Sequence, residues 1–162
     1  MAQTQLGWRI DAVDGSLAML AHARRRVDGA GLRERVRLVL AHLPSAALDR
    51  ACYDVIVSNS LLHHLADPVD LWRSLRRLAS PGAVVVMMDL CRPASRREAR
   101  ALVETNSPHE PDVLKDDFVR SLLAAHTPGE VRRQLAAAGL GELVVQQVSD
   151  LHLVVRGRLD TR

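Results

Sequence analysis

Acidic and small polar residues stand directly after segments that have the composition of β-strands. The segment Trp8–Asp14 (WRIDAVD) ends on an acid, and Asn59 and Ser60 follow the apolar run Tyr53–Ser58. Open α/β sheets bind ligands at the carboxyl ends of their strands, where a carboxylate can accept hydrogen bonds from both hydroxyls of a ribose. The competing interpretation is that Asp14 caps the helix that follows it.

Two adjacent histidines, His63 and His64, lie a few residues further on, in the segment SNSLLHHL. Neighbouring residues cannot share a helix face, and neither histidine has a second histidine or cysteine three or four residues away to complete a zinc site. We therefore predict no metal site. A histidine packed near a bound ligand and a purely structural histidine both stay open as interpretations.

Strands and helices alternate along the chain. Strand-like segments are short apolar runs, and helical segments carry apolar residues three or four positions apart. The predicted strands cover residues 8–14, 36–43, 53–58, 83–88, 143–148 and 152–158. Helices are expected from Ser16, from Asp67 and from Thr127, and two more between Leu90 and His126 on either side of TNSPHEP.

Capping signals support these boundaries. Asp67-Pro68 combines an N-cap with proline at the first helical position, and Thr127-Pro128-Gly129-Glu130 adds a capping-box glutamate. The helix after Pro68 is expected to stop before Pro81-Gly82. The alternation predicts an α/β fold with a doubly wound, mostly parallel sheet, and the short turn at residues 149–151 permits a final antiparallel hairpin.

Four segments in this order resemble class I S-adenosylmethionine-dependent methyltransferases. RIDAVDGSLAMLAHARRRV is similar to the second strand and helix of that family, and YDVIVSNSLLHHL to its fourth strand and loop. LRRLASPGAVVVMMDL resembles the next helix and strand, and the closing hairpin resembles the last two strands. The resemblance covers roughly Gly7 to Leu159 and implies a Rossmann-like fold, methyl transfer and the cofactor S-adenosyl-L-methionine.

The resemblance also implies roles for individual residues. Asp14, followed by Gly15, is expected at the ribose, and Met19 against adenine, although a methionine there is equally typical of a core. In place of the family's adenine-binding acid, the sequence has Ala41, His42 and Leu43, so only a backbone contact is expected. The loop residues Asn59 and Ser60 are expected at the mouth of the cofactor or substrate site.

Related enzymes build a substrate cover where this chain has the stretch from Arg92 to Phe118. Four of its residues could act as a base, but the same composition is typical of solvated loops, so no catalytic residue is assigned. These residues are Asn106, His109, Asp116 and Asp117.

The family's first strand and glycine-rich loop have no counterpart in the sequence, which contains no Gly-x-Gly-x-Gly segment. That strand is central in the family, so the chain is expected to form a single, incomplete domain over residues 1–162. Its strands should separate into two parts with open edges, which favour self-association. Alternatively, residues 8–14 could pair directly with residues 53–58. Cofactor binding by these residues alone is expected to be weak or absent.

Composition limits the remaining possibilities. The 162 residues are 48% hydrophobic and 25% charged but only 2% aromatic, so the core must be aliphatic. The net charge of +3 comes from scattered residues without interleaved aromatics, which makes a nucleic-acid partner unlikely. Cys52 and Cys91 are isolated, and neither a membrane-spanning run nor a signal peptide is evident. A cytoplasmic protein acting on a small molecule is expected.

Two other function classes remain. A non-catalytic or partner-completed interaction module is consistent with the missing strand and loop. A dinucleotide-binding oxidoreductase would also place an acid after its second strand. The SNSLLHHL loop and the final hairpin favour the methyltransferase interpretation over the oxidoreductase.

Overall fold

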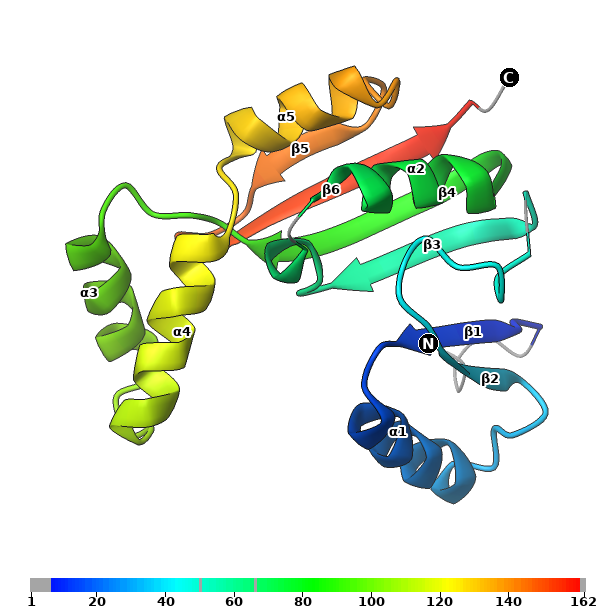
Figure 1. Ribbon diagram of the computed structural model, residues 1–162, viewed down its shortest axis with the longest axis horizontal. Helices are drawn as coiled ribbons and strands as arrows, with labels where there is room; N and C mark the ends of the chain where they lie inside the picture. The colour runs from blue at the N-terminus through cyan, green and yellow to red at the C-terminus, as the bar shows by residue number, and fades with distance from the viewer. Residues whose placement is uncertain (1–6, 50, 66, 161–162) are drawn as a thin grey trace. The chain divides into compact units, whose positions relative to one another are not determined.

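The computed structural model describes residues 7–49, 51–65 and 67–160. The chain divides into two compact units, Met1–Leu48 and Asp49–Arg162 (Figure 1). Each unit has its own sheet.

The first unit contains two parallel strands and one helix. Strand β1 (Ile10–Asp14) pairs with β2 (Val36–Leu40), and Asp14 lies opposite Leu40 at the carboxyl end. Between them runs α1 (Leu17–Gly29), capped by the hydroxyl of Ser16, which accepts from the Met19 amide. The expected apolar face of this helix is not buried: no residue of α1 is buried, and Leu17 is 70% exposed.

The second unit is built on a four-stranded sheet in the order β3-β4-β6-β5. Its strands are β3 (Tyr53–Asn59), β4 (Ala79–Leu90), β5 (Val144–Gln147) and β6 (His152–Leu159). Strands β3 and β4 are parallel, and β6 runs antiparallel to both β4 and β5, so three of the four strands share one direction. The α/β class and the final hairpin are confirmed. The described strands form two sheets, β1-β2 and β3-β4-β6-β5.

The helix expected to stop before Pro81-Gly82 does so, ending at Leu78, but the next strand begins earlier than the expected Ala83. Strand β4 already begins at Ala79, which lies opposite Tyr53, whereas Val55 lies opposite Val84. The residues between Ala79 and Val84 are therefore a bulge inside the strand, with Gly82 at a φ of +77°. A bulge accommodates a proline and a left-handed glycine without ending the strand.

Two helices cover one face of this sheet (Figure 1). Helix α2 (Val69–Leu78) buries Trp72 and Leu75, and α5 (Pro128–Ala137) buries Val131 and Leu135. The capping box of α5 is present as expected. At α2 the described helix begins one residue later than expected, at Val69, whose amide donates to the Asp67 carboxylate at 2.9 Å.

The segment between β4 and α5 forms two helices, as expected, and they pack together as a hairpin. Helices α3 (Arg96–Asn106) and α4 (Asp112–Ala124) pack through a small apolar core. The buried members of this core are Leu90, Ala99, Val103, Val119, Leu122 and Ala125. Among the described residues, no helix is both long enough and apolar enough to cross a membrane.

Candidate functional site

The carboxylate of Asp14 stands at the tip of β1, half-buried. Its Oδ1 accepts from the Ser16 amide at 2.7 Å, so the predicted helix-entry role is present in part. No other described residue forms a hydrogen bond or ion pair with the carboxylate, which leaves Oδ2 available to accept further hydrogen bonds. The backbone carbonyl of Asp14 accepts from the Ala41 amide at 3.2 Å, which joins the loop after β2 to this strand tip.

Gly15 and His42 are in direct contact. A Cβ added to Gly15 would lie 2.5 Å from Cε1 of His42 and 2.8 Å from its Nδ1. The His42 imidazole therefore packs against Gly15, the residue that follows Asp14 in the sequence. Of the predicted cofactor residues, the structure brings together Asp14, Gly15, Ala41 and His42.

Met19 lies apart from this contact, on the side of α1 that lines a surface hollow. The hollow has a volume of about 530 Å³, and both Asp14 and Met19 line it, together with Ala12, Val13, Leu20, His22, Ala23 and Arg26. The Met19 side chain is 56% exposed, so it is not a core residue of the first unit. A free carboxylate oxygen beside apolar side chains suits a ligand with both hydroxyl groups and an apolar ring.

Asn59 and Ser60 belong to the second unit, where they end β3. Both are exposed, and Ser60 has a φ of +54°. The Ser60 amide donates to the Met88 carbonyl at 2.9 Å, which fixes the loop against β4.

A buried carboxylate holds the residues that follow this loop. Asp89, near the end of β4, is 4% exposed. Its Oδ2 accepts from the Leu62 amide at 2.7 Å, and its Oδ1 lies 2.7 Å from Nδ1 of His63 and 2.9 Å from the Leu90 amide. Leu62–His64 form the 3-10 helix η1. The sequence analysis assigned no role to Asp89. Its position directly after the predicted buried strand 83–88 could have marked it as a site residue, as it did for Asp14.

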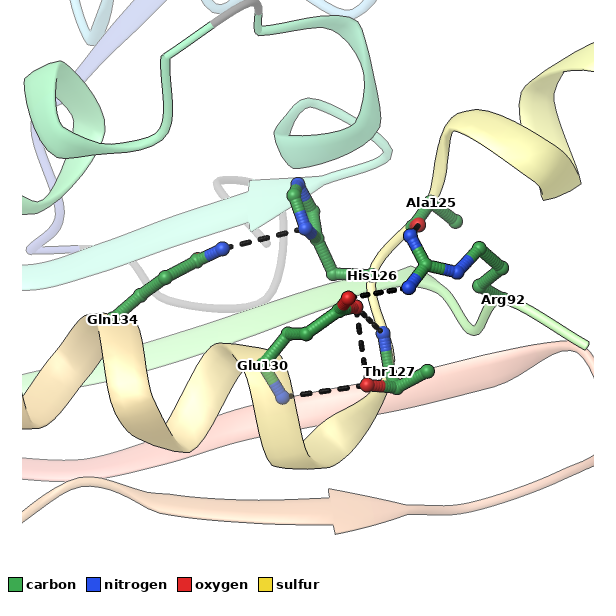
Figure 2. Close-up of polar contacts among 6 residues, drawn as sticks. All are labelled: Arg92, Ala125, His126, Thr127, Glu130 and Gln134. Carbon is green, nitrogen blue, oxygen red and sulfur yellow. Dashed lines mark hydrogen bonds and ion pairs between the residues drawn. The ribbon is translucent and has the colours of Figure 1, made fainter.

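A second polar cluster joins the end of β4 to the start of α5 (Figure 2). Arg92 donates to the carboxylate of Glu130 and to the Ala125 carbonyl. The Thr127 amide donates to Glu130 at 2.8 Å. These contacts, the backbone amide first and then Arg92, lower the pKa of Glu130 to about 2.

His126 lies beside this cluster, and its ring points toward Gln134 and away from Arg92 (Figure 2). Nδ1 of His126 is 3.3 Å from Nε2 of Gln134, whose Oε1 accepts from the indole N–H of Trp72 at 3.2 Å. Burial lowers the pKa of His126, more than the neighbouring carboxylates of Glu130 and Asp89 raise it. The residue was not among the predicted site residues.

Residues 1–85, about half of the chain, match the family model described as "Methyltransferase domain". The chain belongs to the methyltransferase domain family. The expected family is thus confirmed, although no curated protein matches the sequence.

Solved methyltransferases share the fold of this methyltransferase domain. A SAM-dependent methyltransferase from Aquifex aeolicus is 19% identical with a TM-score of 0.64, covering 93% of this chain and 68% of its own. Geranyl diphosphate methyltransferase in complex with SAM is 13% identical with a TM-score of 0.67, covering 98% and 71%. The plantazolicin methyltransferase BpumL in complex with SAH is 12% identical with a TM-score of 0.69, covering 99% and 70%. Other matched structures are longer, and the chain spans as little as 45% of one.

The glycines of the methyltransferase domain do not form the family's loop in the described residues. The Gly-x-Gly triplets at residues 29–31 and 139–141 lie where α1 and α5 end. The four candidate bases of the expected cover are exposed residues of the α3–α4 hairpin or its turn: Asn106, His109, Asp116 and Asp117. No three histidine, cysteine or acidic side chains of the described residues are grouped to hold a metal ion.

Proposed function

We propose that this chain is part of an S-adenosylmethionine-dependent methyltransferase and that its two units are parts of one domain over residues 1–162. The observation that carries the proposal is the free Oδ2 of Asp14 beside the hollow lined by Met19, within the residues that match the family. Oδ2 can accept from a ribose hydroxyl, and the apolar wall can pack against adenine.

Residues with an expected cofactor role are proposed in each unit separately. In the first unit, Asp14 and Met19 bind the nucleoside, Gly15 permits close approach of the backbone, and Ala41 to Leu43 border it. In the second unit, Asn59 and Ser60 contribute the loop after β3. When bound, S-adenosylmethionine supplies a methyl group on a positively charged sulfur. The chain's task is to orient that group toward an acceptor, because close positioning is the main source of rate in such transfers.

The acceptor proposed for this chain is a small molecule. Two of the solved relatives carry substrate names, geranyl diphosphate and a plantazolicin analogue, and neither name refers to a nucleic acid. The scattered charge of this chain favours the same class. Cys52 and Cys91 form no disulfide among the described residues, which agrees with the proposed reducing cytoplasm.

Weak cofactor binding by residues 1–162 is part of the proposal, because no Gly-x-Gly-x-Gly loop is available to approach the cofactor. Saturation-transfer NMR with S-adenosylmethionine detects such binding. Signal at the ribose and adenine protons is expected for the wild type and for Asp11→Ala, a control on the same strand. The signal should be lost in Asp14→Ala.

Three outcomes contradict parts of this proposal. If the wild-type protein transfers no saturation to millimolar S-adenosylmethionine, the nucleoside site is rejected. If Asp14→Ala leaves the ligand signal unchanged, the role of that carboxylate is rejected. Micromolar binding in calorimetry rejects the weak-binding claim. Saturation transfer from the protein to NAD, and none to S-adenosylmethionine, favours an oxidoreductase.

The separate sheets favour one second candidate, a module completed by a partner chain or by self-association. Strand β3 lies at a sheet edge, and exposed edges pair readily with other strands. Size-exclusion chromatography with light scattering distinguishes the two candidates, since a well-folded monomer at all concentrations argues against strand pairing between chains.

A further inference from the structure

One face of the four-stranded sheet of the second unit is uncovered. Successive side chains of a strand point to opposite faces, and one set, which includes Val85 and Val155, is buried beneath the helix layer. The alternate side chains point to the other face, where they are exposed or half-buried. We call this surface the open valine face; it comprises Val55 and Val57 of β3, Val84, Val86 and Met88 of β4, and Val144 of β5.

The open valine face is a continuous apolar surface. Val57 lies opposite Val86 in the parallel pair, and Val55 lies opposite Val84, so these side chains stand in rows across neighbouring strands. Val57 is 50% exposed and Val86 is 41% exposed. Parallel strands are normally covered on both faces, and a contiguous exposed apolar patch marks an interaction surface. An apolar occupant is therefore expected on this face.

Two arginines border the open valine face along β6. Arg156 lies opposite Val86, and Arg158 lies opposite Val84. Each guanidinium donates to a neutral oxygen, at 3.3 Å to a side-chain amide for Arg156 and at 3.1 Å to a backbone carbonyl for Arg158. No described carboxylate forms an ion pair with either of them. The positive charge beside the apolar surface is therefore available to an acidic partner.

We propose that the open valine face is the docking surface for an amphipathic helix of a partner chain, with acidic residues along one edge of its apolar stripe. Arg156 and Arg158 are two residues apart on one face of a strand, a separation of about 6.7 Å. Residues four apart on a helix are separated by about 6 Å along its axis. Carboxylates at positions i and i+4 can therefore meet both arginines while the adjoining stripe packs on the valines.

The opposite face of the same sheet shows that its strands accept helices. There α2 buries Trp72 and Leu75, and α5 buries Val131 and Leu135 (Figure 1). A helix layer on each side is the usual way to cover both faces of a largely parallel sheet. The proposed helix would complete this three-layer arrangement, and its docking does not depend on cofactor binding.

A second copy and a lipid surface fit the open valine face less well. No residue of the face or of its arginine border is acidic, so two identical faces would bring arginines together without a carboxylate. Elements that bind at membrane surfaces carry tryptophan, phenylalanine and leucine side chains, whereas this face consists of valines and one methionine.

Binding of a synthetic peptide to residues 1–162, without cofactor, tests the proposal. The peptide, of about 20 residues so that it can be helical, has a leucine stripe and glutamates at positions i and i+4 along one edge. The matched peptide has lysines in place of these two glutamates. In valine-methyl NMR, the glutamate peptide should shift Val57 and Val86 saturably, with a dissociation constant of about 100 µM. Val113, which is 65% exposed on α4, should not shift.

Two results of this titration overturn the proposal. If Val57 and Val86 do not shift, or shift no more than Val113, the face is not the docking surface. If the two peptides bind equally, the partner is not selected by its acidic edge. Since no cofactor is present, either failure is distinguishable from failure of the cofactor test.

Charge reversal separates recognition from folding. The double variant Arg156→Glu with Arg158→Glu should bind the glutamate peptide about tenfold or more weakly and should gain binding of the lysine peptide, which a misfolded protein cannot do. The neutral variant Arg156→Gln with Arg158→Gln should bind the two peptides equally. Arg97→Glu with Arg100→Glu, at exposed positions of α3, is the matched control and should behave as the wild type. If the first two variants keep the wild-type preference, the proposal is overturned.

Sedimentation of the free chain and mixing with phosphatidylserine vesicles test the other occupants. Neither a dimer nor vesicle binding that depends on the face is expected. A dimer that is lost in Val57→Asp but kept in Val113→Asp would assign the face to a second copy. Vesicle binding with the same dependence would assign it to lipid. Either result overturns the proposal.

A soluble gadolinium chelate tests whether the face is open in the free chain. It should broaden the methyl signals of Val57 and Val86 as it does those of Val113, and it should spare the buried Val131. If Val57 and Val86 are protected as Val131 is, the face is already covered and the proposal is overturned.

Discussion

Trp72 of α2 and Gln134 of α5 are joined by a 3.2 Å hydrogen bond from the indole Nε1 to Oε1. Trp72 is fully buried, so Gln134 supplies a partner that water cannot. The amide nitrogen of the same side chain lies 3.3 Å from Nδ1 of His126, which connects α5 to the segment before it. A single side chain thus contacts both a buried indole and an imidazole.

Gln134→Leu should lower the free energy of unfolding of the second unit by about 1–3 kcal/mol, because the indole N–H loses its acceptor in a buried position. Urea denaturation in a Trp8→Phe background measures this effect, with Trp72 as the remaining tryptophan. The exposed control Gln147→Leu should change stability by less than about 0.5 kcal/mol. Equal effects of the two substitutions would show that the Trp72 contact is not stabilising.

The lowered pKa of His126 predicts a pH-dependent loss of stability. The unfolded chain takes up a proton near pH 6.5, whereas the folded chain does so only at lower pH. The titration of His126 therefore does not reduce the free energy of unfolding above pH 6.5. Below that, the free energy of unfolding falls as the pH drops toward the lowered pKa of His126. Urea midpoints measured across this window should fall less in His126→Asn than in the wild type. The control His109→Asn should keep the wild-type slope.

Glu130 predicts a second loss at more acidic pH. Its pKa is lowered from 4.5 to about 2, so its contribution is present above pH 4.5 and is lost as the pH falls toward 2. The carboxylate is 29% exposed, and after allowance for solvent screening the contribution is about 1–2 kcal/mol. Glu130→Gln keeps an acceptor for the Thr127 amide but cannot titrate.

Acid unfolding of Glu130→Gln, compared with Glu142→Gln at an exposed position, tests this assignment. The first variant should show a shallower decline between pH 4.5 and 2 than the wild type. The second should follow the wild type. Parallel curves for all three proteins would assign the acid sensitivity to other carboxylates.

Much of the fold follows from local sequence. The Thr127–Glu130 capping box, the two helices α3 and α4 and the antiparallel β5–β6 hairpin were predicted from residues close together in the chain. Pro81-Gly82 misled the prediction, because a turn and a bulge use the same residue types. Only the pairing partner β3 distinguishes them, and that pairing is a long-range contact.

The candidate site was predictable only in part, for a similar reason. Asp14 and Gly15 stand in a recognisable strand-to-helix turn, and the structure brings His42 to them. By contrast, His63 meets a carboxylate 26 residues away, and Gln134 meets an indole 62 residues away. Neither spacing is periodic, so these two contacts could not be predicted without the sheet that assembles them.

The contact between Gly15 and His42 predicts an effect in the first unit that depends on its partner. Gly15→Ala places a methyl group 2.5 Å from Cε1 of His42, so the ring must move. Because His42 is exposed and can rotate, the expected cost is about 0.5–1 kcal/mol, below that of overpacking a core. In a His42→Ala background the same change should cost almost nothing. A double-mutant cycle by urea denaturation measures the coupling, with Trp8 as reporter in a Trp72→Phe background. Equal costs in both backgrounds would show that the two residues do not interact.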